Sequence, residues 1–439
     1  MLGLLCSLLT SIVMADNSRM YASESMPSYG SQSYEKPDVY FVLHGTQIVC
    51  LVLSICFSLF IDRPRHEQKD LNKWLAWYIV LCVVAFITSL RTYSLEDWLG
   101  KKAIHPGGVI CYVLCGIALI SISPYAWKVL DKCFMCLAGV LSISALILIG
   151  TLRTGARWET VATLNGLLNP LFWYASWTLL RPHSKAGLWA NSIRFIPLSV
   201  VLLCAVLTQI RLHFVMVILT LIASLYAAKR RRRVNIRSSA TVMFSLLTGV
   251  LVLLLVLPWL AQSNATKDFF ELPYTQLLGR LFDDTRSPQL SEFFLQVSPL
   301  DLLLGKGAFA SYTWSGSLGA DYASGVENLY VSLAFYGGAP LLIAFCGTLL
   351  LPAVRVLNSQ LSDIRLSLSL MVVLWFLRMA ISTSLSVSLD FYVLPLCVGG
   401  CLRVRGRGAT DTLHFRSGHR PYMIGPQRHC TREQTTPCV

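Results

Sequence analysis

Long apolar stretches separated by short polar connectors run along almost the whole chain. The stretch LTGVLVLLLVLPWLA (247–261) shows none of the period-two alternation that a membrane barrel strand requires. The stretches approach the length of a helix that crosses a bilayer, and a spanning helix satisfies its backbone polar groups internally. The pattern therefore predicts an all-α polytopic membrane protein with about twelve transmembrane helices. The predicted spans are 2–15, 40–60, 74–90, 107–126, 133–150, 160–180, 190–210, 212–228, 238–260, 328–351, 364–383 and 386–402.

Positive charge predicts the orientation of these spans. If all twelve cross, the connectors alternate between the two sides of the membrane. One set, which includes the KRRRR run (229–233) and the tail 403–439, holds 23 Lys and Arg residues, whereas the other set holds 12. Because cytoplasmic connectors carry the excess of Lys and Arg, the first set and both chain termini are predicted to be cytoplasmic. The first span, 2–15, is either a retained helix or a cleaved signal.

Composition agrees with a membrane protein. Of the 439 residues, 54% are hydrophobic and 14% are charged, against about 25% charged in soluble domains. The net charge of +14 is explained by the cytoplasmic connectors, so no nucleic-acid partner is expected. None of the 14 cysteines falls in an external connector, and the CxxC of Cys133 and Cys136 has no second pair. The sequence predicts no external disulfide, no metal and no cofactor.

One external connector, 261–327, is far longer than the others and is expected to carry function. Within it, five apolar residues recur at helical spacing, which predicts short amphipathic pieces that lie on the membrane or cap a cavity. These residues are Leu290, Phe293, Phe294, Val297 and Leu300. The sequence thus predicts a transmembrane domain, 1–402, that includes this loop, and a basic, disordered cytoplasmic tail, 403–439.

Charged residues gather on or near the predicted outer face. They are Arg153, Arg157, Arg211, Arg280, Arg286 and Arg378, with the acids Glu327 and Asp390. Guanidinium groups fit phosphate oxygens bidentately and stay charged, and a lipid-linked diphosphate presents its phosphates at this depth. We therefore expect a cationic outer cavity that binds such a diphosphate, with a carboxylate that takes a proton from a sugar hydroxyl.

Each of these residues also has a structural explanation that the sequence leaves open. Arg211 would serve as the cap of a tight turn, and Arg378 would pair with Asp390 to fasten two helices. Glu327 would be a charge favoured at a helix N-terminus. The loop arginines would be solvated or paired with Asp283 and Asp284. Arg194, near the cytoplasmic end of its span, is expected to extend its charge to the interface.

Several stretches together resemble the O-antigen polymerase and O-antigen ligase superfamily. The turn in LTQIRLHFVMVILTLIASLYAAKRRRR (207–233) is similar to the family's Ser-Arg turn with a basic run behind it, although Ile210 stands in place of the serine. NGLLNPLFWYAS (165–176) is similar to its Asn-Pro-rich span. GR (279–280), LLLGKGAFASY (302–312) and ENLYVSLAFYGG (327–338) follow its loop pattern in order. Ligases place a histidine where this chain has Glu327, which favours a polymerase.

The resemblance implies a metal-independent glycosyl transfer between polyprenyl-diphosphate-linked oligosaccharides at the outer face of the bacterial inner membrane. In this interpretation Arg211 and Arg280 bind the diphosphate with Arg153 or Arg157, and Glu327 is the catalytic base. Asn328 and Tyr330 of the same motif are expected to bind substrate, together with Arg286, Arg378 and Asp390. The glycan is an O-antigen or an exopolysaccharide, and expected partners are the lipid bilayer, a chain-length regulator and a flippase. A ligase and a lipid-linked glycan flippase remain as alternatives.

Overall fold

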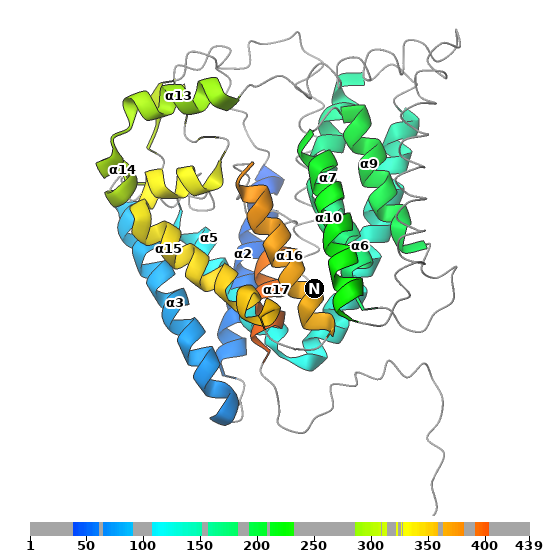
Figure 1. Ribbon diagram of the computed structural model, residues 1–439, viewed down its shortest axis with the longest axis horizontal. Coiled ribbons are helices and arrows are strands. Elements are labelled where there is room, and N and C mark those ends of the chain that lie inside the picture. The colour runs from blue at the N-terminus through cyan, green and yellow to red at the C-terminus, as the bar shows by residue number, and fades with distance from the viewer. Residues whose placement is uncertain are drawn as a thin grey trace, which may run out of the picture. The chain divides into compact units, whose positions relative to one another are not determined.

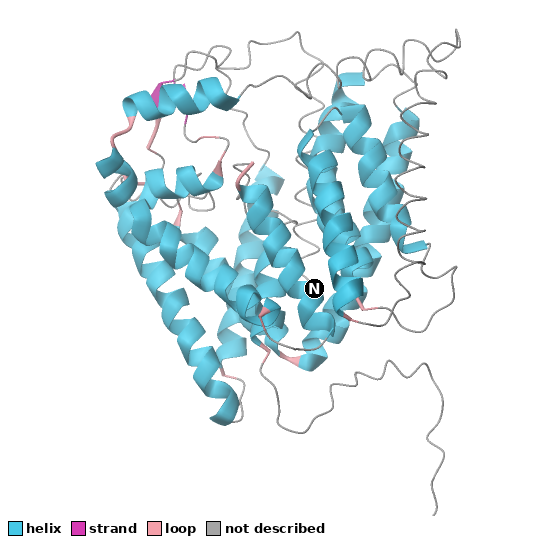
Figure 2. Ribbon diagram, in the orientation of Figure 1, coloured by secondary structure: helices cyan, strands magenta, loops and turns pink. Residues whose placement is uncertain are grey.

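The computed structural model of the chain is mostly helical (Figures 1 and 2). It describes residues 38–60, 65–90, 108–151, 157–182, 193–208, 211–231, 286–308, 310–313, 322–323, 326, 328–358, 363–381 and 391–403. By its contacts the chain forms two units, residues 1–405 and 406–439, and all described residues belong to the first.

The described helices occur along the chain in the following order. They are α2 (Asp38–Leu59), α3 (Arg65–Leu90), α5 (Val109–Val113), the 3-10 helix η1 (Leu114–Ile122), α6 (Pro124–Thr151), α7 (Arg157–Leu180), the 3-10 helix η3 (Ile193–Phe195), α9 (Ile196–Thr208), α10 (Arg211–Arg230), α13 (Arg286–Gln296), α14 (Pro299–Leu304), α15 (Leu329–Leu357), α16 (Asp363–Met379) and α17 (Val393–Leu402). Two short strands, β1 (Tyr312–Thr313) and β2 (Tyr322–Ala323), pair antiparallel.

Ten of the twelve predicted spans coincide with described helices, and 2–15 and 238–260 lie outside the described residues. By length and composition, four helices are apolar enough to cross a membrane: Asp70–Leu90, Ala126–Ile149, Leu212–Arg230 and Leu329–Leu357. Shorter apolar helices cover Gly45–Leu59, Val109–Ile122, Ile196–Ala205 and Val393–Leu402. The helical membrane protein that the sequence predicts is therefore supported, while the count of twelve spans and the external position of 261–327 stay predictions.

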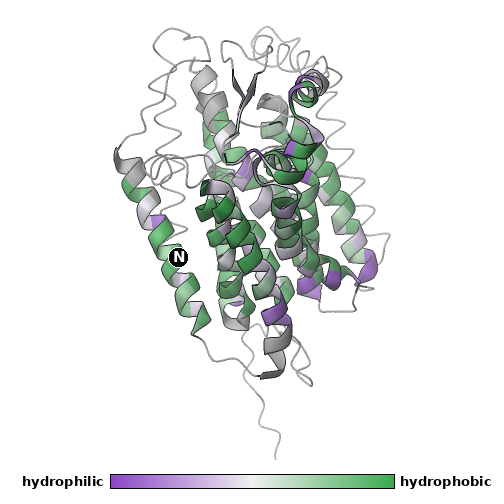
Figure 3. Ribbon diagram, turned by 90° about the vertical axis from the view of Figure 1, so that its left-hand side faces the viewer, coloured by the Kyte–Doolittle hydropathy of each residue, from purple (hydrophilic) through white to green (hydrophobic). Residues whose placement is uncertain are grey.

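Large apolar side chains lie on the surface of α3 and α6. On α3, Ile79, Phe86 and Leu90 are exposed, and on α6 so are Ile143 and Ile147. Figure 3 shows hydrophobic residues along most of the helix lengths and hydrophilic residues gathered toward helix ends. Contiguous apolar surface of this extent is unfavourable in water and is typical of helices that face lipid.

Helix α7 lies at the centre of one helix group and is buried over its second half. It packs against α6, α9, α10 and α16, and every side chain in 170–180 is buried. A helix that is apolar around its whole circumference is stable only when neighbours cover each face. Pro170 lies inside it without ending it.

Arg231 joins three helix ends. Its Nη2 donates to the carbonyl oxygens of Leu180 at 2.8 Å and Asp363 at 3.2 Å, and to the hydroxyl of Ser367. It thereby satisfies a carbonyl group at the C-terminus of α7 and joins that end to the first turn of α16. The C-termini of α7 and α10 and the N-terminus of α16 therefore lie together, and we call this the basic end. Arg231, a member of the basic run that predicts the topology, therefore also links these helices.

The described part of the predicted external loop forms a cap, α13, α14 and β1, on the first part of α15 (Figure 1). A small apolar core of Phe293, Val297, Tyr312, Phe335 and Tyr336, with Val326, holds the cap to α15. The predicted helical spacing is correct for Leu290, Phe293 and Val297, whereas Phe294 and Leu300 are exposed. The spacing fails beyond Val297 because Ser298 begins a new helix, α14.

Helix α15 is broken at Gly338, whose φ is 72° and ψ is −175°. The break would leave carbonyl groups of the first part unpaired, and the GKG stretch of the cap supplies donors to two of them. The amide of Lys306 donates to the carbonyl of Phe335 at 2.8 Å, and the amide of Gly307 donates to that of Tyr336 at 2.9 Å. The Gly-x-Gly motif thus contributes main-chain hydrogen bonds to the broken helix. Its first residue, Gly305, has a φ of 78°, a conformation that favours glycine.

Candidate functional site

Away from the basic end, three polar side chains from α7, α10 and α16 meet inside the helix group. Nη2 of Arg378 donates to Oδ1 of Asn169 at 2.7 Å. Nε2 of His213 lies 2.9 Å from the same oxygen. We call Asn169, His213 and Arg378 the Asn169 cluster. It joins residues that are more than 200 positions apart in the sequence, and it ties the end of α16 to α7 and α10.

A stacked pair of indole rings lies beside the guanidinium of Arg378. Trp173 and Trp375 stack with ring centroids 5.1 Å apart and planes 9° from parallel. The guanidinium carbon lies 5.7 Å from the first ring and 5.4 Å from the second. Cation–π attraction of this kind strengthens when water is excluded, so the rings stabilise the charge and fix the plane of the fork.

The cluster reaches the accessible surface through Asn169. Arg378 is 2% exposed and His213 is 4% exposed, whereas Asn169 is only half-buried. One turn earlier on α7, Gly166 is exposed, and a Cβ built there would meet nothing within 4 Å. The side of α7 that carries Gly166 and Asn169 is therefore open enough for a ligand to approach.

Several buried polar atoms beside this opening have no hydrogen-bond partner among the described residues. They are Nδ1 of His213 and the indole nitrogens of Trp173 and Trp375. Buried donors and acceptors in folded proteins are almost always paired with protein, water or a ligand. Unpaired atoms on three side chains around one arginine are therefore typical of a functional site rather than of a packed apolar core.

Helix α15 begins next to α16 close to this cluster. The side chain of Asn328 caps the helix, with Oδ1 accepting from the amides of Tyr330 at 3.0 Å and Val331 at 3.3 Å. The hydroxyl of Tyr330 donates to the carbonyl of Phe376 at 2.6 Å, two residues before Arg378. Of the two predicted substrate-binding residues, Asn328 thus caps α15, and Tyr330 holds the start of α15 against the end of α16.

The remaining predicted site residues are placed only in part. Arg211, Arg157 and Arg286 are the first residues of α10, α7 and α13. A helix rises about 1.5 Å per residue. Along the axis of α10, Arg211 therefore lies about 3 Å from His213, whereas along the axis of α7, Arg157 lies about 18 Å from Asn169. Glu327, Arg153, Arg280 and Asp390 lie outside the described residues, and Glu327 directly precedes the N-cap of α15.

Sequence reasoning missed Asn169, His213, Trp173 and Trp375 as members of a site. The signal was present, because Asn169 precedes Pro170 in the middle of an apolar span and His213 is a lone polar residue in another. Polar residues inside spans are functional candidates by default. The sequence does not show which helices pack together, however, so it could not indicate that Asn169 and His213 lie in the same place.

Comparison with models of known protein families gave no match, and comparison with curated proteins gave none either. The assignment of function therefore rests on the residues themselves. In the described part of the chain, no group of three or more His, Cys, Asp or Glu side chains is arranged to hold a metal ion.

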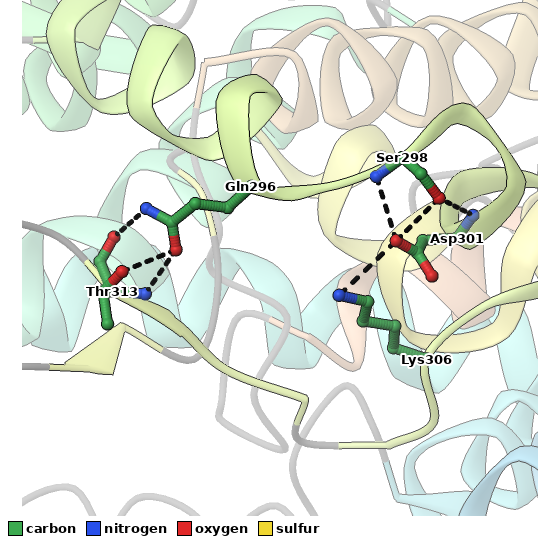
Figure 4. A network of polar contacts seen from close by, with 5 residues as sticks. All are labelled: Gln296, Ser298, Asp301, Lys306 and Thr313. Carbon is green, nitrogen blue, oxygen red and sulfur yellow. Dashed lines mark hydrogen bonds and ion pairs between the residues drawn. The ribbon is translucent and has the colours of Figure 1, made fainter.

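The cap carries its own polar contacts, shown in Figure 4. Ser298 and Asp301 form a capping box at the start of α14, in which the amide of Ser298 donates to Oδ2 of Asp301 at 2.9 Å. Nζ of Lys306 lies 3.4 Å from the same carboxylate. Gln296 at the end of α13 exchanges hydrogen bonds with Thr313, donating to its carbonyl at 2.7 Å and accepting from its amide at 2.9 Å. These contacts order the segment that supports the break in α15.

Acid is expected to loosen α14 through Asp301. Hydrogen bonds from the backbone and hydroxyl of Ser298 lower the pKa of Asp301 below its usual value. A carboxylate with a lowered folded pKa stabilises the fold fully above its unfolded pKa of about 3.9, and that contribution is lost as the pH falls through the folded pKa. Hydrogen exchange of the α14 amides, corrected for intrinsic rates, should therefore accelerate as the pH is lowered below about 4. Asp301→Asn should remove this acceleration, and an unchanged pH profile in that variant would contradict the assignment.

Proposed function

We propose that this protein is a polysaccharide polymerase that joins polyprenyl-diphosphate-linked repeat units at the outer face of a bacterial inner membrane. The observation that carries the proposal is the Asn169 cluster, with a buried arginine bonded to a half-exposed amide. A charge buried between apolar helices is costly and is normally retained for function. The cluster lies where α10 begins with Arg211 and where α15 begins behind Glu327 and Asn328.

Asn169 would present hydrogen-bond donors to the substrate. Arginine has no acceptor, so the side-chain oxygen of Asn169 must face Arg378, and Nε2 of His213 must then carry its proton to donate to that oxygen. This arrangement leaves the amide NH2 group of Asn169 to donate elsewhere. A fixed donor on the accessible side of α7 fits a sugar hydroxyl or a phosphate oxygen. Apolar side chains of the same span offer no donor for either group.

The proposed reaction moves a growing glycan from one lipid carrier to another. The hydroxyl oxygen of the acceptor sugar attacks the anomeric carbon of the donor glycan, and the bond from that carbon to the diphosphate oxygen breaks. The acceptor proton passes to the carboxylate of Glu327, and the electron pair of the broken bond leaves with the polyprenyl diphosphate. Arg211 and Arg280 would stabilise the negative charge that develops on the diphosphate, as fixed cations do in other leaving-group sites.

In vesicles that contain the purified protein, a polyprenyl-diphosphate-linked oligosaccharide should be converted to a ladder of longer glycans, with one polyprenyl diphosphate released per bond formed. Arg211→Gln should lower the rate at least about tenfold, because it removes a cation that pairs with the leaving group. Arg230→Gln is the matched control, since Arg230 lies at the other end of α10 and should leave the rate unchanged.

Three results would each contradict a part of the proposal. Long polymer at wild-type levels in Arg211→Gln would remove Arg211 from the site. Transfer of a finished glycan to a lipid A core without elongation would identify a ligase. Movement of the lipid-linked glycan across the vesicle membrane without any new bond would identify a flippase.

A further inference from the structure

A second buried arginine lies at the basic end, on the opposite side of the helix group from the Asn169 cluster. The sequence predicts that Arg194 extends to the interface, but in the structure Arg194 is 7% exposed. It belongs to η3, and its carbonyl accepts a hydrogen bond from the hydroxyl of Thr178 on α7 at 3.0 Å. The short helix is thereby held against the C-terminal part of α7, and the guanidinium is turned inward.

Asp131, whose charge acts on Arg194, is already engaged by other donors. Oδ1 of Asp131 accepts from the indole nitrogen of Trp177 at 2.8 Å, and Oδ2 lies 3.5 Å from Nη1 of Arg181. Arg194 experiences the favourable charge of Asp131 and the unfavourable charge of Arg181. The single carboxylate of Asp131 thus contacts Arg181 and attracts Arg194, and the three side chains together carry a net charge of about +1.

Arg194 also has an unsatisfied donor. Its Nη1 atom is buried and has no hydrogen-bond partner among the described residues. An unpaired buried cation is among the costliest features of a folded protein, and an anionic oxygen placed against the free edge of the fork would remove both the unpaired donor and the excess charge. The group formed by Arg194, Arg181 and Asp131 thus lacks one component, and that component is an anion.

We infer that Arg194 and Arg181 form a binding site for a phosphate group at the basic end, between α6, α7 and η3. Guanidinium forks bind phosphate oxygens in pairs, whereas a chloride ion offers no such geometry. Two sources of phosphate are available at this depth: an anionic phospholipid of the cytoplasmic leaflet and a free phosphate ion. Basic sites between helices on the cytoplasmic side commonly hold anionic lipid headgroups. The site does not depend on the polymerase assignment.

The test measures the thermal midpoint of the purified protein in an uncharged detergent during titration with phosphatidylglycerol, diacylglycerol or inorganic phosphate. A ligand that binds the folded state raises the midpoint in proportion to its occupancy. Phosphatidylglycerol should raise it in the wild type, and diacylglycerol, which lacks the phosphate, should not. An equal rise with inorganic phosphate would identify the free ion as the ligand, and a rise with the lipid alone would identify the headgroup.

Arg194→Gln should weaken the phosphatidylglycerol effect about tenfold in lipid concentration, since it removes a charge-assisted pair of hydrogen bonds. Arg194→Lys, which keeps the charge and loses the fork, should retain part of it. Arg355→Gln removes an exposed cation from the last turn of α15 and should behave as wild type.

If Arg194→Gln does not fold, Arg181→Gln provides the same test from the half-exposed member of the pair, with the same weakening expected. Equal shifts with phosphatidylglycerol and diacylglycerol, or a full lipid effect in a folded Arg194→Gln or Arg181→Gln protein, would overturn the inference. Because the measurement uses no glycan, its outcome is separate from that of the polymerisation assay.

Discussion

Polymer formation is expected to fall about a hundredfold when Arg378 is replaced with methionine. The guanidinium fixes Asn169 through the 2.7 Å hydrogen bond and lies beside the stacked rings of Trp173 and Trp375. Loss of one positioned donor in a water-excluded site typically costs about 100-fold to 1,000-fold in rate, or about 2.7–4 kcal/mol of transition-state stabilisation. Since Arg378 is buried, we assign it a positioning role through Asn169 and expect kcat to fall while KM changes little.

The variant should remain folded, because no buried carboxylate loses its partner among the described contacts and Nε2 of His213 still lies against Oδ1 of Asn169. Asn169→Ala should lower kcat to a similar extent, and the double variant should lose little more, since residues that act as one unit are not additive. Arg365→Met is the matched control, because Arg365 is a buried arginine near the other end of α16. Equal activity per folded molecule in Arg378→Met and Arg365→Met would show that Arg378 has only a structural role.

The cap should detach from α15 when Gly338 is replaced with alanine. A Cβ at this position would meet the carbonyl oxygen of Leu303 at 2.4 Å and the carbonyl carbon of Leu304 at 2.7 Å. Its φ of 72° with an extended ψ is a conformation that is essentially restricted to glycine and costs other residues about 1–3 kcal/mol. The strain and the clash together should lower the local opening free energy by about 3 kcal/mol, which corresponds to more than a hundredfold faster hydrogen exchange.

Exchange should accelerate at the amides of Lys306 and Gly307, whose hydrogen bonds cross the break, and in α14. Gly139→Ala is the control, because a Cβ on that α6 glycine would meet nothing within 4 Å. Alanine there should stabilise the helix by up to about 1 kcal/mol and leave exchange in the cap unchanged. Wild-type protection at Lys306 in Gly338→Ala would mean that the GKG stretch does not depend on the break in α15.

Much of the secondary structure could be predicted from local pattern. Apolar stretches such as 133–150 and 212–228 coincide with α6 and α10, because a helix is the conformation that satisfies the backbone of a long apolar segment. The helical spacing of Leu290, Phe293 and Val297 likewise gave α13. The boundary between α13 and α14 at Ser298 was not predicted, because the apolar spacing continues across it.

From the sequence, the site could be predicted only as a set of charged residues near one face of the membrane, without the contacts among them. The arginines that begin α7 and α10 and the one that ends α16 were recognised as candidates, and Arg378 meets residues of both other helices. Its partner Asn169 was named in the sequence only as part of an Asn-Pro-rich span. Contacts between residues 169, 213 and 378 depend on the rotation of three helices about their axes, and hydropathy contains little information about rotation when a helix is apolar on every side.

The sequence by itself determined that the chain is a helical membrane protein and that its cations are concentrated at helix ends, because length, hydropathy and charge act through the local solvent, which is either lipid or water. The tertiary structure alone decided which cations are buried. Arg378 lies beside a stacked pair of indole rings and bonds to Asn169, a partner that the sequence did not predict, and Arg194 is buried although it was expected to extend its charge to the interface. It also decided that GKG pairs with the broken helix. These outcomes depend on which helices pack together, and packing is a property of pairs of segments that no single segment encodes.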